Sequence, residues 1–142
     1  MSGEIVAAGG RRELQEGPQG HAAAGGPFTP NQLNRLDEAL TLSSRETGLT
    51  FSVYVGELQN PARAHAEALF ERLDDGSVLL AVSPGQRVLH IVTGPDSAKR
   101  LPNRACALAA LAMRASFANG DLVGGIVTGL RMLADSAGTA PR

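Results

Sequence analysis

The fold is decided by residues 77–92, which read SVLLAVSPGQRVLHIV. The first part, Val78–Val82, is apolar without alternation, and this pattern is typical of a strand that is covered on both faces. Residues 83–86 form a turn around a Pro-Gly pair, and a further strand follows at Val88–Val92. Because the connection is so short, these two strands must run antiparallel.

A strand and a helix precede this stretch. Phe51, Val53 and Val55 alternate with Thr, Ser and Tyr residues, which predicts a half-buried strand over residues 49–55. A helix then begins at Asn60-Pro61 and ends at the turn formed by residues 74–76. The order strand, helix, covered strand is a βαβ unit, whose strands run parallel with a right-handed crossover. The sheet is therefore expected to be mixed.

The helix in front of this unit has a specific start signal. Thr29 is a good N-cap, Pro30 suits the first helical position, and Gln32 can complete a capping box. Leucines recur at helical spacing after the cap, and the helix is predicted to end at Gly48.

Two helices follow the sheet. An Ala-rich helix is predicted over residues 103–117, and Asp121 caps a final helix over residues 122–133. Gly125 and Gly129 are expected to let the final helix approach a neighbouring backbone closely, since the Lys-Ser/Thr of a P-loop is missing. The predicted fold class is α/β: a three-layer α/β/α sandwich with a small mixed sheet, made of the βαβ unit plus an antiparallel hairpin strand, and two C-terminal helices.

The chain of 142 residues fits one domain with a segment at each end. Residues 1–27 contain seven glycines and two prolines and are predicted to be a disordered Gly-rich tail, in which Glu4–Ala8 could still form a short edge strand. The α/β domain is expected over residues 28–136, and residues 137–142 are expected to be a frayed C-terminal tail.

Composition excludes several classes of function. A formal net charge of -1 gives little counterion-release energy with nucleic acid, and aromatic residues at 4% argue against a base-stacking surface. The single cysteine, Cys106, rules out an internal disulfide and a multi-cysteine zinc site. No secretory signal and no apolar run of the roughly 20 residues that a transmembrane segment needs are found. A cytoplasmic location is therefore expected, with envelope association left open.

The central stretch also resembles a known family. Residues 75–84, DGSVLLAVSP, followed by residues 87–92, RVLHIV, are similar to the centre of the TPM domain. Residues 116–121, SFANGD, resemble its C-terminal motif, and residues 28–33, FTPNQL, resemble its opening helix. The TPM domain is a small α/β fold linked to phosphatase activity, so the resemblance implies such a fold and a carboxylate site. The chain is also similar to an actinobacterial family of unknown function.

The chain departs from the TPM pattern after the third strand. The TPM domain has a Gly-rich turn there that carries a tyrosine and a glutamate, and the glutamate helps to define its site. The equivalent residues 93–100, TGPDSAKR, contain neither. This departure favours a member of the family without catalytic activity.

Four carboxylates are the candidate metal ligands: Asp74, Asp75, Asp96 and Asp121. The antiparallel hairpin is expected to bring Asp75 and Asp96 to the same edge of the sheet. Ca²⁺ and Mg²⁺ bind several oxygens of this kind, and such a cluster could hold a water for attack on a phosphate ester. The alternative is structural, because Asp-Asp-Gly is a common turn and Asp121 is an ordinary N-cap.

Basic residues near the same loop are the candidate anion site. Arg87, Arg100 and Arg104, with Lys99 among them, could form a rim. Arginine is well suited to recognise phosphate or carboxylate groups. The alternative is a solvated charged face.

Two functions from different classes follow. The favoured one is a non-catalytic accessory or interaction module with an unknown protein partner, able to hold Ca²⁺ or Mg²⁺. The alternative is a weak metal-assisted phosphomonoesterase, in which Asp75 and Asp121 bind the ion and Arg100 or Arg104 holds phosphate. We expect a monomer or a weak homodimer that binds no nucleic acid.

Overall fold

The computed structural model describes residues 3–7, 10–13 and 28–140. Its strands form one sheet in the order β2-β1-β3-β4-β5. The longer elements along the chain are β1 (Gly3–Ala7), β2 (Gly10–Glu13), α2 (Pro30–Thr47), β3 (Thr50–Gly56), α3 (Ala62–Phe70), β4 (Ser77–Ser83), β5 (Val88–Thr93), α4 (Asn103–Ala118) and α5 (Leu122–Ala137). Two short 3-10 turns, Pro84–Gln86 and Ser97–Lys99, follow β4 and β5.

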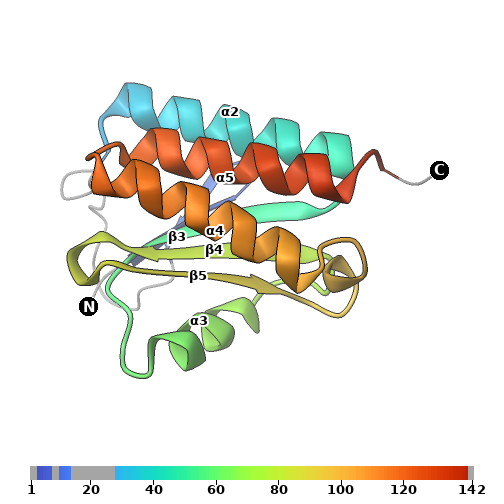
Figure 1. Ribbon diagram of the computed structural model, residues 1–142, viewed down its shortest axis with the longest axis horizontal. Helices are drawn as coiled ribbons and strands as arrows, with labels where there is room; N and C mark the ends of the chain where they lie inside the picture. The colour runs from blue at the N-terminus through green and yellow to red at the C-terminus, as the bar shows by residue number, and fades with distance from the viewer. Residues whose placement is uncertain (1–2, 8–9, 14–27, 141–142) are drawn as a thin grey trace.

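The elements are stacked in three layers. Helices α2, α5 and α4 lie side by side on one face of the sheet, and α3 lies on the other (Figure 1). β3 and β4 pair in parallel, while β4 and β5 pair antiparallel with Val82 opposite Leu89. The predicted α/β/α sandwich with a mixed sheet and two C-terminal helices is therefore confirmed.

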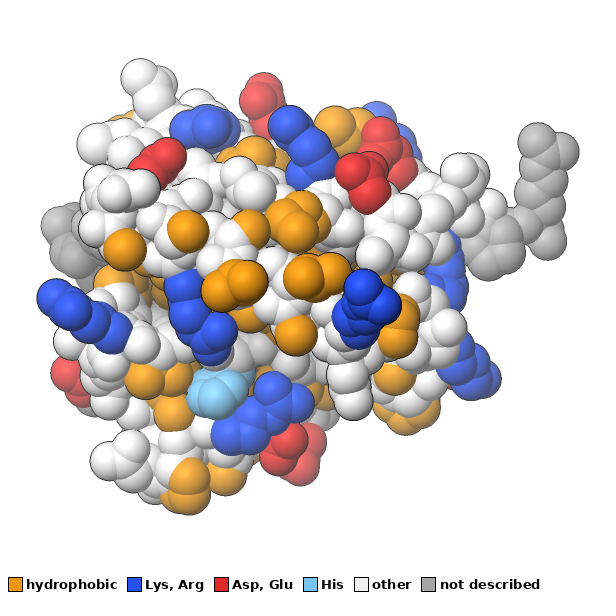
Figure 2. All heavy atoms as spheres, viewed as in Figure 1, with side chains coloured by type: hydrophobic (Ala, Val, Ile, Leu, Met, Phe, Trp, Pro, Cys, Tyr) orange, Lys and Arg blue, Asp and Glu red, His pale blue; other side chains and the backbone are white. Residues whose placement is uncertain are grey.

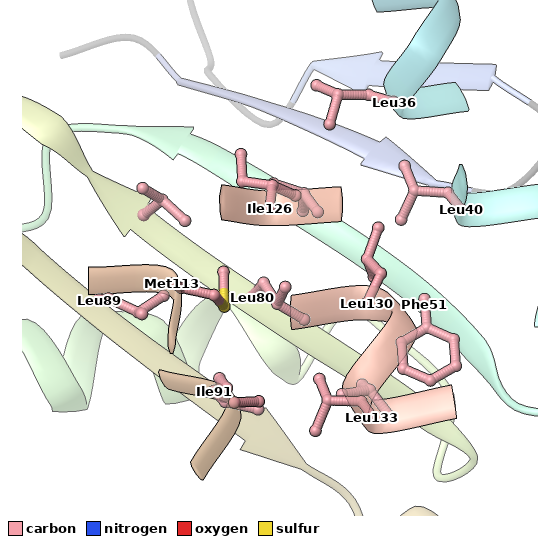
Figure 3. Packing of buried hydrophobic residues seen from close by; sticks show 14 of the residues in the cluster. Leu36, Leu40, Phe51, Leu80, Leu89, Ile91, Met113, Ile126, Leu130 and Leu133 are labelled. Carbon is pink, nitrogen blue, oxygen red and sulfur yellow. The ribbon is translucent and has the colours of Figure 1, made fainter. Parts of the chain in front are cut away.

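The larger core lies between the sheet and the three-helix layer. Leu80 and Ile91 of the sheet point toward Leu130, Leu133 and neighbouring side chains of the helices (Figure 3). Leu80, Leu130 and Leu133 are completely buried. Burial of one such leucine contributes about 2 kcal/mol relative to leaving it in water.

A smaller core on the opposite face corrects the prediction for β3. Tyr54 packs there with Leu79 and Ala81 of β4 and with Ala66 of α3. Ser52, on the same face, is fully buried, and its Oγ has no hydrogen-bond partner among the described residues. β3 is thus covered on both faces rather than half-buried, because it lies inside the sheet and α3 covers the face that the polar residues suggested was open.

The N-terminal strands correct part of the prediction of a disordered tail. β1 pairs antiparallel with β3, with Ile5 opposite Tyr54, and β2 continues the sheet as an antiparallel hairpin with β1. An edge strand over Glu4–Ala8 was left open as an alternative; a strand does form there, but β1 lies inside the sheet and β2 forms its edge. The backbone of β3 offers hydrogen-bonding groups on that side, and pairing satisfies them. The rest of the predicted tail, residues 1–2, 8–9 and 14–27, falls outside the described residues.

The predicted caps at Thr29, Gly48 and Asp121 are confirmed, whereas α3 ends at Phe70, before the predicted turn at residues 74–76, and α5 runs beyond the predicted residue 133 to Ala137. Thr29 and Gln32 form the capping box, and the C-cap Gly48 has the left-handed φ of 80° that favours glycine. The carboxylate of Asp121 accepts a hydrogen bond from the Gly124 N–H at the start of α5. Within the described residues, no helix is both long and apolar enough to span a membrane.

Glycines of α5 allow α4 to pack closely against it. A Cβ added at Gly125 would lie 2.6 Å from the ring of Phe117, and one at Gly129 would collide with the buried side chain of Met113. A neighbouring helix does pack closely on these glycines, but their near neighbours are side chains of α4 rather than the backbone that was predicted.

Candidate interaction surface

Three of the four predicted carboxylates lie at one edge of the sheet. The backbone N–H groups of Asp96 and Ser97 both donate to the Asp75 carbonyl oxygen, each at 3.2 Å. The Asp74 carbonyl accepts from the Ser77 N–H, which closes the turn before β4. The expected meeting of Asp75 and Asp96 is thus confirmed. The contacts join backbone groups, however, and the Asp96 carboxylate lies 3.8 Å from the Lys99 ammonium.

Asp121 lies at the opposite end of the molecule. Ser97 donates its N–H to the Asp75 carbonyl and accepts from the Arg100 N–H. The Arg100 side chain in turn contacts the C-terminal end of α5. Asp121 caps the N-terminal end of the same 16-residue helix, roughly 24 Å away at 1.5 Å per residue. The structure therefore does not bring Asp121 to the other three carboxylates. Among the described residues, no three or more His, Cys, Asp or Glu side chains are grouped closely enough to hold a metal ion.

The predicted anion ligand Arg100 has a structural role. Its Nη1 donates to the Thr47 carbonyl at 2.6 Å, at the end of α2. Its Nη2 lies 3.0–3.1 Å from three carbonyl oxygens at the end of α5, those of Ala137, Gly138 and Thr139. The last carbonyls of a helix have no intrahelical donor, and a cation there also interacts favourably with the helix dipole. Both terminal guanidinium nitrogens of Arg100 therefore already donate to the two helix ends.

The other two predicted anion ligands are exposed and lie apart. Arg87 is in the turn between β4 and β5 and has a φ of 58°. Arg104 is in the first turn of α4, next to the opposite end of β5. The three arginines consequently do not form one rim.

Two of the three large apolar residues that are exposed among the described residues lie on α4. Leu108 is 49% exposed and Leu111 is 65% exposed. Arg104 and Arg114 flank them on the same helix, which contains no acidic residue. We call these four residues the α4 face. Figure 2 shows apolar side chains gathered over α4 and α5, with Lys and Arg side chains around them.

Two arginines also line the free edge of β5, immediately beside α4. Arg63 of α3 donates through Nη1 to the Ile91 carbonyl at 3.1 Å. Arg114 of α4 reaches the Leu89 carbonyl with a longer Nη2–O distance of 3.4 Å. The two side chains approach β5 from opposite faces of the sheet, because α3 and α4 lie on opposite faces (Figure 1).

The titration of neighbouring groups reflects this positive charge. The pKa of His90 on β5 is lowered from its ordinary value, first by partial burial and then by the charges of Arg63 and Arg114. The pKa of the Cys106 thiol is raised, because burial disfavours the thiolate. Cys106 therefore behaves as the partly buried apolar residue that its neighbours suggested.

Side-chain patterns along the sequence did not identify this surface. On an Ala-rich helix the exposed and buried faces have similar hydropathy, so Leu108 and Leu111 could not be assigned to the outside. Arg63 and Arg114 stand 51 positions apart in the sequence, and only the assembled sheet brings both to β5. The absence of acidic residues from residues 103–118 was the one available signal.

Comparisons with known proteins identify relatives in mycobacteria. The chain is 38% identical over 117 residues to "Uncharacterized protein Rv2468c" of Mycobacterium tuberculosis strain H37Rv, covering 81% of this chain and 69% of that protein. It matches "Uncharacterized protein MT2543" of strain CDC 1551 to the same extent. The expected similarity to an actinobacterial family is thus confirmed.

Solved structures share the fold at low sequence identity. The BA42 protein of Bizionia argentinensis aligns with a TM-score of 0.70 and 14% identity, over 78% of this chain and 81% of that one. The N-terminal domain of a P. gingivalis protein aligns with a TM-score of 0.69 and 16% identity, over 78% and 76%. The N-terminal domain of the Corynebacterium glutamicum cg2496 protein aligns with a TM-score of 0.63 and 12% identity, over 91% and 93%.

A family match covers nearly the whole chain. Residues 2–134 match the domain of unknown function DUF5130, and this range includes both N-terminal strands and the four described helices up to the last turn of α5. The chain belongs to the DUF5130 family.

Proposed function

We propose that this chain is a non-catalytic interaction module that binds a partner protein on its α4 face. The observation that supports the proposal is the exposure of Leu108 and Leu111 on a helix that carries arginine and no acidic residue. Large apolar side chains that lie together on a surface are typical of interaction sites. The arginines favour a partner surface with carboxylates around an apolar centre.

We also propose that the DUF5130 family is a divergent relative of the TPM domain. The support is the position of the shared motifs: residues 75–84 and 87–92 lie on β4 and β5, and residues 116–121 form the turn between α4 and α5. The motifs thus fall on two neighbouring strands of the sheet and on the turn between two packed helices. This proposal concerns the fold and carries no activity with it.

No observation favours the phosphomonoesterase alternative. It needs one ion between Asp75 and Asp121, which lie at opposite ends of α5, and a phosphate ligand in Arg100, whose terminal nitrogens contact the helix ends. The carboxylates also do not fit a structural Ca²⁺ or Mg²⁺, since such ions require several converging oxygens. The module that we propose therefore needs no metal.

Site-specific photocrosslinking in the protein's own cells tests the module. A benzophenone amino acid is placed at Leu111, and the matched control carries it at Leu42, a leucine of α2 that is 55% exposed. We expect a discrete adduct with one protein from position 111 only, and its loss in Arg104→Glu/Arg114→Glu. Equal adduct patterns from positions 111 and 42, or no adduct from 111, would contradict the proposal.

A further inference from the structure

The outer side of β5 is an edge of the sheet, and the side chains of Arg63 and Arg114 cover backbone carbonyls along it. In an antiparallel pair, alternate residues exchange hydrogen bonds with the neighbouring strand, and the residues between them point their N–H and C=O groups away. The arginine contacts identify Leu89 and Ile91 as residues whose backbone N–H and C=O groups point away from β4. Leu89 lies opposite Val82, and Ile91 lies opposite Leu80. The residues of these two pairs therefore exchange no hydrogen bonds with each other.

The two kinds of backbone group on this edge differ in how they are satisfied. The Leu89 and Ile91 carbonyls accept from Arg114 and Arg63, and the Arg114 bond at 3.4 Å is long and weak. The Leu89 and Ile91 N–H groups point to the same side as these carbonyls, and outside the β4–β5 ladder they have no backbone acceptor among the described residues. The edge therefore has two donors without a strand partner among the described residues, beside two cationic side chains. Because Leu89 and Ile91 are buried, these donors become accessible only when the arginine side chains move away. Arg63 also pairs with Glu67, at 3.1 Å between Nε and Oε2 on an exposed surface.

The charges on the edge decide which strand it can accept. In a symmetric pairing of two β5 strands, the arginines of both copies would meet, and like charges across strands are destabilising. Charged side chains that cover an edge are a common device against self-pairing. An acidic strand reverses this effect, because its carboxylates would bind the guanidinium groups that repel a second copy.

We propose that β5 binds an extended acidic segment of the partner protein by strand addition. The segment's carbonyls accept from the Leu89 and Ile91 N–H groups, and two of its carboxylates bind Arg63 and Arg114 as these leave the β5 carbonyls. This inference rests on the proposed function and assigns the way in which the partner docks. Main-chain hydrogen bonds then provide affinity, and side-chain contacts provide specificity.

The geometry sets the spacing of the acidic residues. Arg63 approaches from the α3 face and Arg114 from the α4 face. Successive side chains of a strand point to opposite faces, so the two acidic residues must be an odd number of positions apart. Residues of the segment that face α4 would lie beside Leu111, which is one helical turn before Arg114.

A displayed library of random nine-residue peptides, selected on the full chain, tests the inference. We expect enriched peptides with β-branched residues and two acidic residues at odd separation. Binding of such a peptide should slow the hydrogen exchange of the Leu89 and Ile91 amides by at least about tenfold, measured by NMR. Absence of enrichment, acidic residues at even separation only, or protection of other amides would overturn the inference.

Variants separate this mode of docking from general attraction. Arg63→Ala/Arg114→Ala should weaken binding of the selected peptide by at least about tenfold, whereas Arg35→Ala/Arg45→Ala, which removes the same charge from exposed positions of α2, should not. Arg63→Glu/Arg114→Glu should instead bind the peptide in which Lys replaces both acidic residues. Unchanged binding by the alanine variant would contradict strand addition.

Other occupants give different results. If the Leu111 crosslink forms but the β5 amides stay unprotected in that complex, the α4 face is confirmed and strand addition is wrong. Binding of the wild type to anionic phosphatidylglycerol vesicles, lost in Leu108→Ser/Leu111→Ser, would assign the face to a lipid surface. Dimerisation of the wild type through protected β5 amides would assign the edge to a second copy. Either result would overturn an acidic partner segment.

Discussion

Replacement of Arg100 by alanine should cost more stability than loss of any other cation in the described part of the chain. The side chain joins the C-terminal ends of α2 and α5 through hydrogen bonds from Nη1 and Nη2. These helices lie side by side on the same face of the sheet, and the 74 residues from Gly48 to Asp121 separate them in the sequence. No other described cation bonds to two helix ends.

The magnitude follows from the contacts. A hydrogen bond from a charged donor contributes about 1.5–3 kcal/mol, and the three carbonyls near Nη2 share two hydrogens, so the contacts cannot be counted as four full bonds. The Thr47 carbonyl belongs to a fully buried residue, whereas Gly138 and Thr139 are exposed and water can replace the guanidinium there. We therefore expect a loss of about 2–3 kcal/mol. At about 4 °C per kcal/mol, the Tm should fall by about 8–12 °C.

Urea unfolding of matched variants checks this estimate. Arg131→Ala is the control, because Arg131 is exposed on α5 and makes no hydrogen bond to another described residue. Arg100→Lys should lose about half as much as Arg100→Ala, since an ammonium cannot reach both helix ends with a planar fork. The m value should be unchanged. A loss below about 0.5 kcal/mol, or one equal to that of Arg131→Ala, would refute the reasoning.

Three further outcomes can be measured. Gly129→Ala gains about 1 kcal/mol of helix propensity but forces the buried Met113 side chain aside at a cost of about 1–3 kcal/mol. Calorimetry should therefore show a net loss of about 1 kcal/mol in the free energy of unfolding. An unchanged or higher Tm would contradict the packing of α4 against α5. By NMR titration, the pKa of His90 should lie below its ordinary value of 6.5. The unfolded chain then takes up the proton first, so the stability that neutral His90 contributes is present above about pH 6.5 and is lost as the pH falls below it. The same pH profile of stability in His90→Gln would contradict this. Chelator, Ca²⁺ and Mg²⁺ should leave the Tm unchanged, whereas a shift lost in Asp75→Ala/Asp96→Ala would establish the cation site that the sequence suggested.

Local signals in the sequence predicted local structure well. The capping box at Thr29, the glycine at position 48 and the Asp121 cap depend on residues within one helical turn, and all three are confirmed. The parallel β3–β4 and antiparallel β4–β5 pairings were also predictable, because connection length restricts strand direction.

Long-range pairing could not be predicted in the same way. The second face of β3 was misjudged because Ser52 is polar, although its position in the sheet requires burial. Arg100 was taken for an anion ligand because its four carbonyl partners belong to the backbone, and backbone carbonyls leave no trace in side-chain patterns. Leu108 and Leu111 were missed because alanine-rich neighbours hide which side of α4 is outside.

The position of β1 between β2 and β3 has a consequence for the biogenesis of the protein. β1 pairs with residues 52–56, so during synthesis its partner emerges only after the 44 intervening residues, 8–51, have been added. A shorter recombinant fragment that begins at residue 28, where the helical pattern starts, would lack both N-terminal strands. It would present β3 as an unprotected edge and would be prone to aggregate. Fragments of this family should therefore retain the N-terminal hairpin.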